Sequence, residues 1–202
     1  MPLRLSAPLL GLAPLDVVPH DGSVDVRIHG RGPYPARPAG PEADAWVGKA
    51  LGVDGLRLVW CSEPGARTVT NSLARPTDRA AFHDVSPVSL ASNTSMAALN
   101  TWMGEDLPVS RFRANLVVDG TEEAFEEDGW STVRIGGAIL RAAGPIQRCV
   151  MTTIDVDTLA KGQDPIKSLA VHRRRDGKTW FAIHLMIDRE GAIAVGDELT
   201  IA

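Results

Sequence analysis

The chain has 202 residues, and its 21 lysines and arginines against 25 aspartates and glutamates give a formal net charge of −4. A chain of this length buries roughly 70% of its unfolded surface, which is enough for a full hydrophobic core. With 44% hydrophobic and 23% charged residues, the composition excludes wholesale disorder, a collagen-like repeat and a coiled coil. The acidic balance offers no basic footprint, so we expect no nucleic-acid partner.

No stretch of the sequence approaches the ~20 apolar residues that a membrane span requires. The best candidate, Leu9–Val18, is interrupted by Gly11, Pro14 and Asp16. The first residues carry one positive charge, Arg4, and no apolar segment long enough for a signal peptide. We therefore expect a cytoplasmic protein without a membrane span.

The chain has two cysteines, Cys61 and Cys149, far apart in the sequence. Two cysteines exclude a disulfide scaffold. They also exclude an iron–sulfur cluster or zinc site that takes several cysteine ligands from this chain. A reduced, intracellular setting is the simpler interpretation.

The N-terminal part predicts a strand, a linker and a helix, in that order. Apolar and polar residues alternate at 24–28, which is typical of a half-buried strand. Proline and glycine crowd 30–41 and predict a loop or linker there. A helix follows, because Pro41 suits a first helical turn and Gly52 can close the C-terminus.

From residue 56 onward the apolar runs are short and rich in β-branched residues, which favours an antiparallel sheet closed on itself or folded over. One helix interrupts them, with Met96, Leu99 and Met103 on one face. Gly136-Gly137 predicts a hairpin turn, and 195–197 predicts the turn into the last strand. The expected strands are 56–60, 88–91, 115–119, 132–135, 149–154, 180–187 and 198–201.

Cys149 is the first candidate for chemistry. Arg148 precedes it, and Gly144 and Pro145 shape a turn just upstream. A neighbouring guanidinium favours the thiolate, which is the form of cysteine that acts as nucleophile or metal ligand. The alternative is a buried, unreactive cysteine on a strand.

The second candidate group is Arg111, Arg113 and Asn115, which project from one face if this segment is extended. Two guanidiniums and an amide suit an anionic ligand with many hydrogen-bonding edges, so all three are candidate binding residues. The alternative is surface charge paired with the acidic run Glu122–Asp128.

Four segments together resemble the MOSC domain, the module named for the C-terminus of molybdenum cofactor sulfurases. They are most similar to the amidoxime reducing component family, in which an R-x-N strand and an R-C-x-x-T-T-x-D segment recur. The resemblance implies a mainly β fold: a MOSC β-barrel with a few short helices at 63–202, preceded by a partial N-terminal β-barrel-like region at 1–62. The four segments are FHDVSPVSLASNTSMAALN (82–100), SRFRANLVVDG (110–120), FEEDGWSTVRIG (125–136) and GPIQRCVMTTIDVDT (144–158).

The resemblance also implies a role for each candidate residue. Cys149 would be the catalytic residue and the thiolate ligand of molybdenum, whose other ligands come from the dithiolene of its pterin cofactor. A soft thiolate suits such a redox-active metal. Arg113 and Asn115 would contact the pterin or its phosphate, Arg148 would sit beside the metal, and Ser92 would form a hydrogen bond to the cofactor.

The sequence departs from the family in two respects. Ala114 replaces the proline of the family's R-P-N strand, which we expect to alter backbone stiffness more than side-chain direction. The opening strands of the N-terminal domain, which carry further residues for the cofactor phosphate in relatives, are expected to be missing before Met1. Cofactor affinity would then lose charge-assisted partners.

The function that the resemblance implies is a molybdenum-cofactor oxidoreductase that reduces N-oxygenated or similar X–O small molecules. Because the chain carries no ferredoxin-like cluster of cysteines, we expect its electrons to come from a separate donor protein through a transient contact. One alternative is a sulfur carrier that holds a persulfide on Cys149, and another is a cofactor-binding protein without catalysis. The TT-x-D tail after Cys149 favours the reductase.

Overall fold

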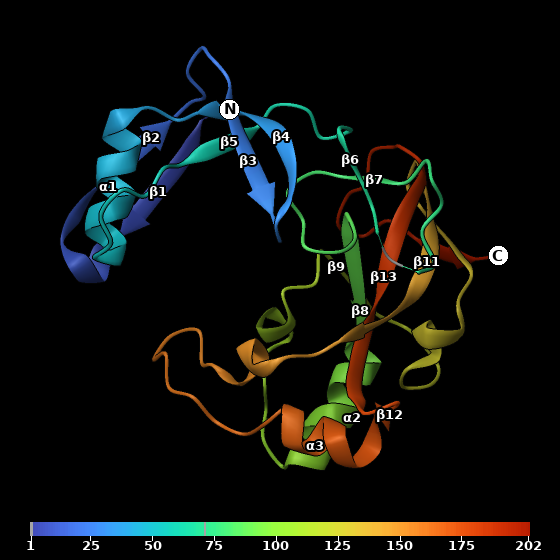
Figure 1. Ribbon diagram of the computed structural model, residues 1–202. Coiled ribbons are helices and arrows are strands. Elements are labelled where there is room, and N and C mark those ends of the chain that lie inside the picture. The colour runs from blue at the N-terminus through green and yellow to red at the C-terminus, as the bar shows by residue number, and fades with distance from the viewer. Residues whose placement is uncertain (1, 71) are drawn as a thin grey trace. The chain divides into compact units, whose positions relative to one another are not determined.

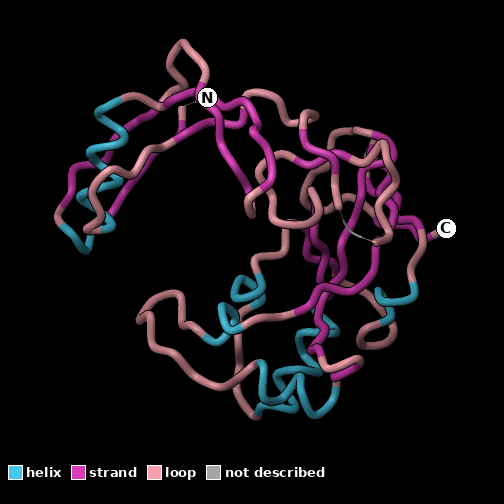
Figure 2. Tube along the Cα trace, in the orientation of Figure 1, coloured by secondary structure: helices cyan, strands magenta, loops and turns pink. Residues whose placement is uncertain are grey.

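The computed structural model describes residues 2–70 and 72–202. The chain divides into two compact units, 1–68 with 79–84 and 69–78 with 85–202, and each is described by itself. Strands dominate both units and the helices are short (Figure 2). The predicted mainly β fold with a few short helices is thereby confirmed, whereas the predicted boundary between 62 and 63 stays a prediction. Within the described residues, no helix is long and apolar enough to cross a membrane.

The first unit contains a hairpin, a three-stranded antiparallel sheet and a helix (Figure 1). Strand β3 forms where the alternating pattern at 24–28 predicted it. A small core of Val17, Ala39 and Ala43 holds the helix against the hairpin. The elements are β1 (Leu3–Ala7), the 3-10 helix η1 (Pro8–Leu10), β2 (Leu12–Val17), β3 (Val24–Ile28), β4 (Arg31–Pro38), α1 (Pro41–Leu51), β5 (Val59–Cys61), β6 (Arg67–Thr68) and β7 (Arg79–Ala80).

The predicted linker at 30–41 is wrong, because most of it is strand β4. This strand pairs with β3 over its first part, and β5 pairs only with Ala36–Pro38. At Pro33 and Pro35 one edge of β4 is therefore unpaired, and proline is tolerated in a strand at such an edge. The proline and glycine content of this segment predicted a loop, but a strand that is unpaired along one edge can contain these residues.

Helix α1 has the ends that the sequence predicted. Pro41 occupies the first turn, and Gly52 adopts a left-handed conformation (φ 64°) while its N–H donates to the Gly48 carbonyl. This is the glycine C-cap geometry. The Trp46 indole N–H donates to the Ala13 carbonyl at 2.8 Å and ties the helix to the preceding hairpin.

The second unit is built on a seven-stranded, barrel-like sheet with the order β14-β10-β11-β13-β8-β9 and with β12 paired to β13 (Figure 1). All pairings are antiparallel except β8 with β9, which helix α2 connects. The turns at 136–137 and 195–197 lie where they were predicted. The strands are β8 (Val88–Ser92), β9 (Leu116–Val118), β10 (Thr132–Ile135), β11 (Ala138–Gln147), β12 (Arg174–Arg175), β13 (Lys178–Arg189) and β14 (Leu199–Ile201).

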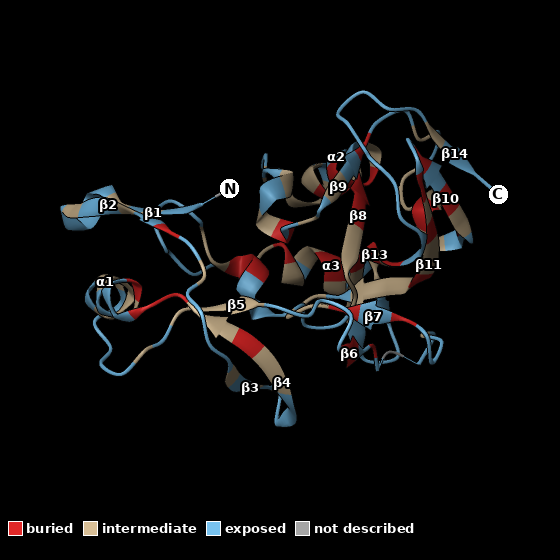
Figure 3. Ribbon diagram, turned by 90° about the horizontal axis from the view of Figure 1, so that it is seen from above, coloured by how far each residue is buried: buried red, intermediate tan, exposed pale blue. Residues whose placement is uncertain are grey.

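Helices cover one end of this sheet. The Met96 and Leu99 side chains of α2 are buried as their spacing predicted, and they share a core with Phe112, Leu169 and Phe181. Figure 3 shows the buried residues along β8 and β10. The helices are α2 (Asn93–Met103), the 3-10 helices η2 (Val109–Phe112), η3 (Glu126–Gly129) and η4 (Val150–Thr153), and α3 (Ile166–His172).

Two segments expected to be extended form 3-10 turns instead. The predicted strand at 149–154 is largely η4, in which the Thr152 and Thr153 hydroxyls donate to carbonyls three residues back. Such local hydrogen bonds let β-branched residues leave the sheet ladder. Residues 109–112 form η2, and Arg113 closes it in a left-handed conformation (φ 53°). The predicted alternation of Arg111, Arg113 and Asn115 along one strand face is therefore wrong.

Candidate functional site

Cys149 lies directly beyond the end of β11, where the sheet gives way to η4. The Arg148 backbone is still held by β13, because its N–H donates to the Thr179 carbonyl at 2.9 Å and its carbonyl accepts the Thr179 hydroxyl at 3.4 Å. On the other side, the Thr152 hydroxyl donates to the Cys149 carbonyl at 3.0 Å. These contacts fix the main chain around an exposed, free thiol.

The Arg148 side chain turns inward from this strand end. Its Nε donates to the Phe181 carbonyl at 2.9 Å, and its Nη1 donates to the Phe112 carbonyl at 3.3 Å. The guanidinium lies 5.2 Å and 5.9 Å from the centroids of these two aromatic rings. Its Nη2 is buried and has no hydrogen-bond partner among the described residues.

A local irregularity in β13 makes the Phe181 carbonyl accessible to Arg148. Ala182 adopts a left-handed conformation (φ 63°), and the β11–β13 register shifts between Pro145 and Gln147. A β-bulge of this kind leaves a residue outside the ladder and turns its groups in a new direction. The irregular backbone thus supplies an acceptor for the buried guanidinium.

The Arg148 guanidinium is a cation that forms no ion pair with a carboxylate among the described residues. Burial lowers the pKa of Arg148 to about 10, and the neighbouring Cys149 thiolate only partly opposes this fall in pKa. A fall of that size corresponds to about 3 kcal/mol of disfavoured charge. An anion close to the guanidinium would offset part of this cost, because a buried charge is tolerated when it is paired.

Arg111 has a different environment, because it forms an ion pair. Its Nη2 lies 2.6 Å from a carboxylate oxygen of Asp155, and 8% of its side chain is exposed. The other Asp155 oxygen accepts hydrogen bonds from the Asp157 N–H and from the N–H and hydroxyl of Thr158. These bonds from Thr158, and then the Arg111 charge, hold the pKa of the Asp155 carboxyl below its usual value of 3.8. Asp155 thus anchors the loop that follows Cys149 to η2.

The remaining predicted site residues lie in three different settings. Arg113 is exposed, and no hydrogen bond or ion pair of its side chain is found within residues 2–70 and 72–202. The Asn115 side-chain oxygen accepts the N–H and hydroxyl of Ser89, both at 2.9 Å. Ser92 is fully buried; it caps α2, and its hydroxyl donates to Glu127. The structure brings Cys149 and Arg148 to one cavity, and the Ser92 hydroxyl is already engaged inside the fold.

A cavity of about 360 Å³ opens beside the cysteine, and we call it the Cys149 cavity. This volume falls within the range of small-molecule sites. Sequence reasoning missed the half of its wall that comes from the loop before α3 and from α3 itself. No sequence signal indicated that this segment lies beside Cys149. The lining residues are Arg148, Cys149, Val150, Thr153, Gly162, Gln163, Ile166 and Lys167.

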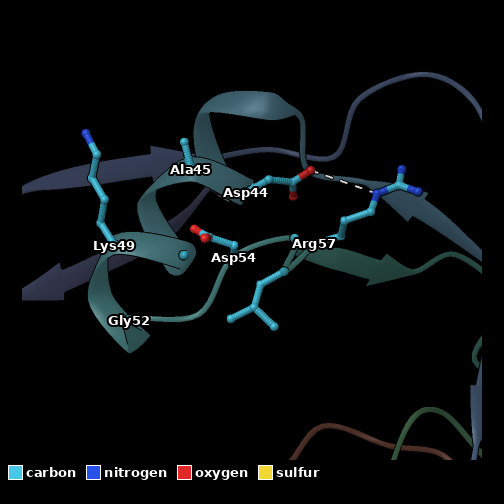
Figure 4. Close-up of a pocket in the computed structure, with 9 residues that line it drawn as sticks. Asp44, Ala45, Lys49, Gly52, Asp54 and Arg57 are labelled. Atoms are coloured by element: carbon cyan, nitrogen blue, oxygen red, sulfur yellow. Dashed lines mark ion pairs between the residues drawn. The ribbon is translucent and has the colours of Figure 1, made fainter.

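A second, larger hollow of about 750 Å³ lies in the first unit, and we call it the α1 hollow (Figure 4). The figure shows the Asp54 carboxylate near its centre, with Lys49 pointing away and Arg57 directed toward Asp44. The Arg57 Nε and the Asp44 Oδ2 are 3.9 Å apart. The residues that line the α1 hollow are Asp44, Ala45, Gly48, Lys49, Gly52, Asp54, Gly55, Leu56 and Arg57.

Chemically, the Cys149 cavity suits a ligand that combines a soft metal with negative charge. The exposed thiol belongs to the soft groups that metals of this kind prefer, and Arg148 and Lys167 bring positive charge to the cavity wall. Among the described residues, no group of three or more His, Cys, Asp or Glu side chains is placed to hold a metal ion. Cys149 thus offers one thiol, and a metal at this site would take its other ligands from elsewhere, for example from an organic cofactor.

Comparison with known proteins decides the family. A model of the MOSC domain matches residues 77–200, which include β8 to β14 and the Cys149 cavity. The chain belongs to the MOSC domain family. The predicted resemblance to this family is confirmed.

Named relatives connect this MOSC domain with molybdenum chemistry. The chain is 32% identical to "Mitochondrial amidoxime reducing component 2" of Bos taurus over 173 residues, covering 80% of this chain and 51% of that protein. It is 30% identical to "Mitochondrial amidoxime-reducing component 1" of Homo sapiens over 184 residues, covering 85% and 54%. It is also 34% identical to "Molybdenum cofactor sulfurase" of Anopheles gambiae over 160 residues, covering 73% and 20%. The chain therefore spans about half the length of the amidoxime reducing components it matches.

Proposed function

We propose that this MOSC protein is a molybdenum-cofactor oxidoreductase that reduces N-hydroxylated or similar X–O small molecules, with Cys149 as the thiolate ligand to molybdenum. The observation that carries the proposal is the exposed Cys149 next to Arg148, a cation whose buried Nη2 has no hydrogen-bond partner within the described residues, at a cavity of molecular size. The names of the relatives support the choice of substrate, since two are amidoxime reducing components.

The protein's contribution is to hold and orient the reacting groups. Cys149 would hold the metal from a main chain that β13 and η4 keep in place. Arg148 would place its positive charge close to the metal and its anionic cofactor, and Arg113 and Asn115 would contact the anionic end of the cofactor. The bound cofactor would supply the two-electron chemistry that removes oxygen from the substrate.

Electrons for this reduction would come from a separate donor protein in the cytoplasm. The chain's two cysteines are too few for the four thiolates that an iron–sulfur cluster uses. A weak and transient contact is typical of such electron-transfer partners.

The proposal is tested by measuring molybdenum per chain, with protein made in a host that synthesises the cofactor. We expect near-stoichiometric metal in the parent and almost none in Cys149→Ser, whose melting temperature should stay close to that of the parent. Cys61→Ser is the matched control and should keep its metal. Reduction of an amidoxime should disappear with the metal.

Three results would redirect the proposal. Equal metal in Cys149→Ser and the parent would overturn the role of Cys149 as ligand. A persulfide on Cys149 without metal would favour the sulfur carrier, in keeping with the similarity to a molybdenum cofactor sulfurase. Bound metal without turnover would favour a cofactor-binding protein.

A further inference from the structure

We propose that the Cys149 cavity selects acidic small molecules and that Lys167 recognises their carboxylate. This inference rests on the proposed function in taking the cavity as the substrate site. Its chemistry, the attraction of an organic anion to the Cys149 side of the cavity, can be measured without turnover.

The charges that line the cavity have one sign. Arg148 and Lys167 are its cationic residues, and none of the residues that line it is an aspartate or glutamate. In the α1 hollow, by contrast, cations and carboxylates occur together. A concave site lined by one sign of charge concentrates ligands of the opposite sign.

Two acidic residues that flank the lining segments have hydrogen-bond or ion-pair partners of their own, although Asp164 keeps its charge because its partner is neutral. Asp164 accepts the N–H and the hydroxyl of Ser168 at 3.0 and 2.6 Å. Asp155 is paired with Arg111. The Lys167 ammonium, in contrast, forms no ion pair in the part of the chain that the structure describes. It is exposed at the cavity wall and can move to meet a ligand, because lysine carries its charge on a flexible stem.

The rest of the lining suits the body of an organic acid. Val150 and Ile166 offer apolar surface. The Thr153 hydroxyl donates to the Val150 carbonyl at 2.8 Å, so its proton is not available to a ligand. The Gln163 side chain is the neutral polar group of the lining that can still donate to a ligand. A mostly apolar wall with a few placed polar groups is typical of small-molecule sites.

The test compares two alkylating reagents of nearly equal size, anionic iodoacetate and neutral iodoacetamide. The full chain is made in a host without the cofactor and checked for a cooperative melting curve, and the alkylation rate of each cysteine is then measured by mass spectrometry of its peptide. Cys61, which is half-buried in the first unit, is the internal control. We expect a higher iodoacetate-to-iodoacetamide rate ratio at Cys149 than at Cys61.

Variants assign this preference to one side chain. Lys167→Gln should lower the rate ratio at Cys149 by about two- to five-fold, the size of one partly exposed charge pair. Lys161→Gln, which removes a lysine six positions earlier that does not line the cavity, should leave the ratio unchanged. An unchanged ratio in Lys167→Gln, or an equal fall in both variants, would overturn the proposal.

The cofactor-loaded enzyme provides the second measurement. For an N-hydroxylated substrate that carries a carboxylate, Lys167→Gln should raise KM and leave kcat unchanged, and KM for the corresponding neutral amide should not move. Equal changes in KM for both compounds would contradict recognition of the carboxylate. If the parent reduces neither compound, the proposed function fails, and the alkylation ratio still decides whether the cavity selects anions.

Discussion

The α1 hollow and the Cys149 cavity differ in charge more than in size. The α1 hollow is about twice as large as the Cys149 cavity, yet it contains its own counter-ions, and its Asp44–Arg57 pair is closed at 3.9 Å (Figure 4). The charged residues that line the Cys149 cavity are both cations, Arg148 and Lys167, and in the described part of the chain the buried Nη2 of Arg148 has no hydrogen-bond partner. The difference shows why we place the proposed binding site at the smaller cavity: its charges have one sign and lie next to a free thiol, whereas volume alone would favour the α1 hollow.

The largest effect should come from removing the uncompensated cation. We expect Arg148→Met to lower cofactor content or activity by about 10- to 100-fold, as for groups that support a metal ligand. Its melting temperature should change little, because the variant removes the cost of burying a charge and also the hydrogen bonds to the Phe181 and Phe112 carbonyls. Arg57→Met in the α1 hollow is the matched control and should retain cofactor. A large fall in melting temperature with normal cofactor content would make Arg148 structural.

A smaller effect is expected at Arg113, which is exposed and forms no side-chain ion pair within the described residues. Arg113→Ala should weaken cofactor retention by about two- to ten-fold, because an exposed charge contributes about 1 kcal/mol or less, and it should leave stability nearly unchanged. Retention is measured as the molybdenum left after dialysis. Equal retention in the variant and the parent would remove Arg113 from the binding site.

The smallest effect at neutral pH, and a distinct one in acid, is expected at Asp155. Its hydrogen bonds from Thr158 and its pairing with Arg111 hold the pKa of this carboxyl below 3.8 in the folded state. The folded state therefore binds this proton less readily than the unfolded state. The stabilisation is complete above pH 3.8 and is lost as the pH falls through the lower folded pKa.

The Asp155→Asn variant tests this linkage. Hydrogen exchange in the loop after η4 should be faster than in the parent at neutral pH, and the loop's acid sensitivity below pH 3.8 should be weaker. Asp157→Asn is the matched control, since the Asp157 backbone N–H, not its carboxylate, contributes to the Asp155 cluster. Identical exchange in Asp155→Asn and the parent would show that the ion pair does not anchor the loop.

Sequence periodicity predicted the elements whose residues follow one regular pattern. The buried stripe of Met96 and Leu99 and the glycine cap of α1 are examples, because local spacing and a left-handed glycine act through the chain itself. The prediction for 149–154 was wrong because the Thr152 and Thr153 hydroxyls bond to nearby carbonyls. The strand propensity of these residues does not reveal whether they pair in a sheet or form a local turn.

The candidate site was predictable only in part. Cys149 and Arg148 are neighbours in sequence, so their pairing at one site needed no fold. The Phe181 carbonyl acceptor, the Asp155 anchor and Lys167 come from segments that only the tertiary structure brings to the same region. Arg111 was predicted to bind a ligand, and its ion pair with Asp155 could not be read from a single sequence.

The clamp of Arg148 by Thr179 and the closure of η4 on the Cys149 carbonyl have a thermodynamic consequence. The backbone that carries the Cys149 sulfur is already ordered. A ligand that binds there would therefore restrict few additional backbone torsion angles. Binding that orders and buries little chain has a small heat-capacity change, whereas coupled folding gives a large one. Calorimetry of ligand binding should therefore show a small heat-capacity change, as expected for binding to a preformed site and not for the folding of a loop around the ligand.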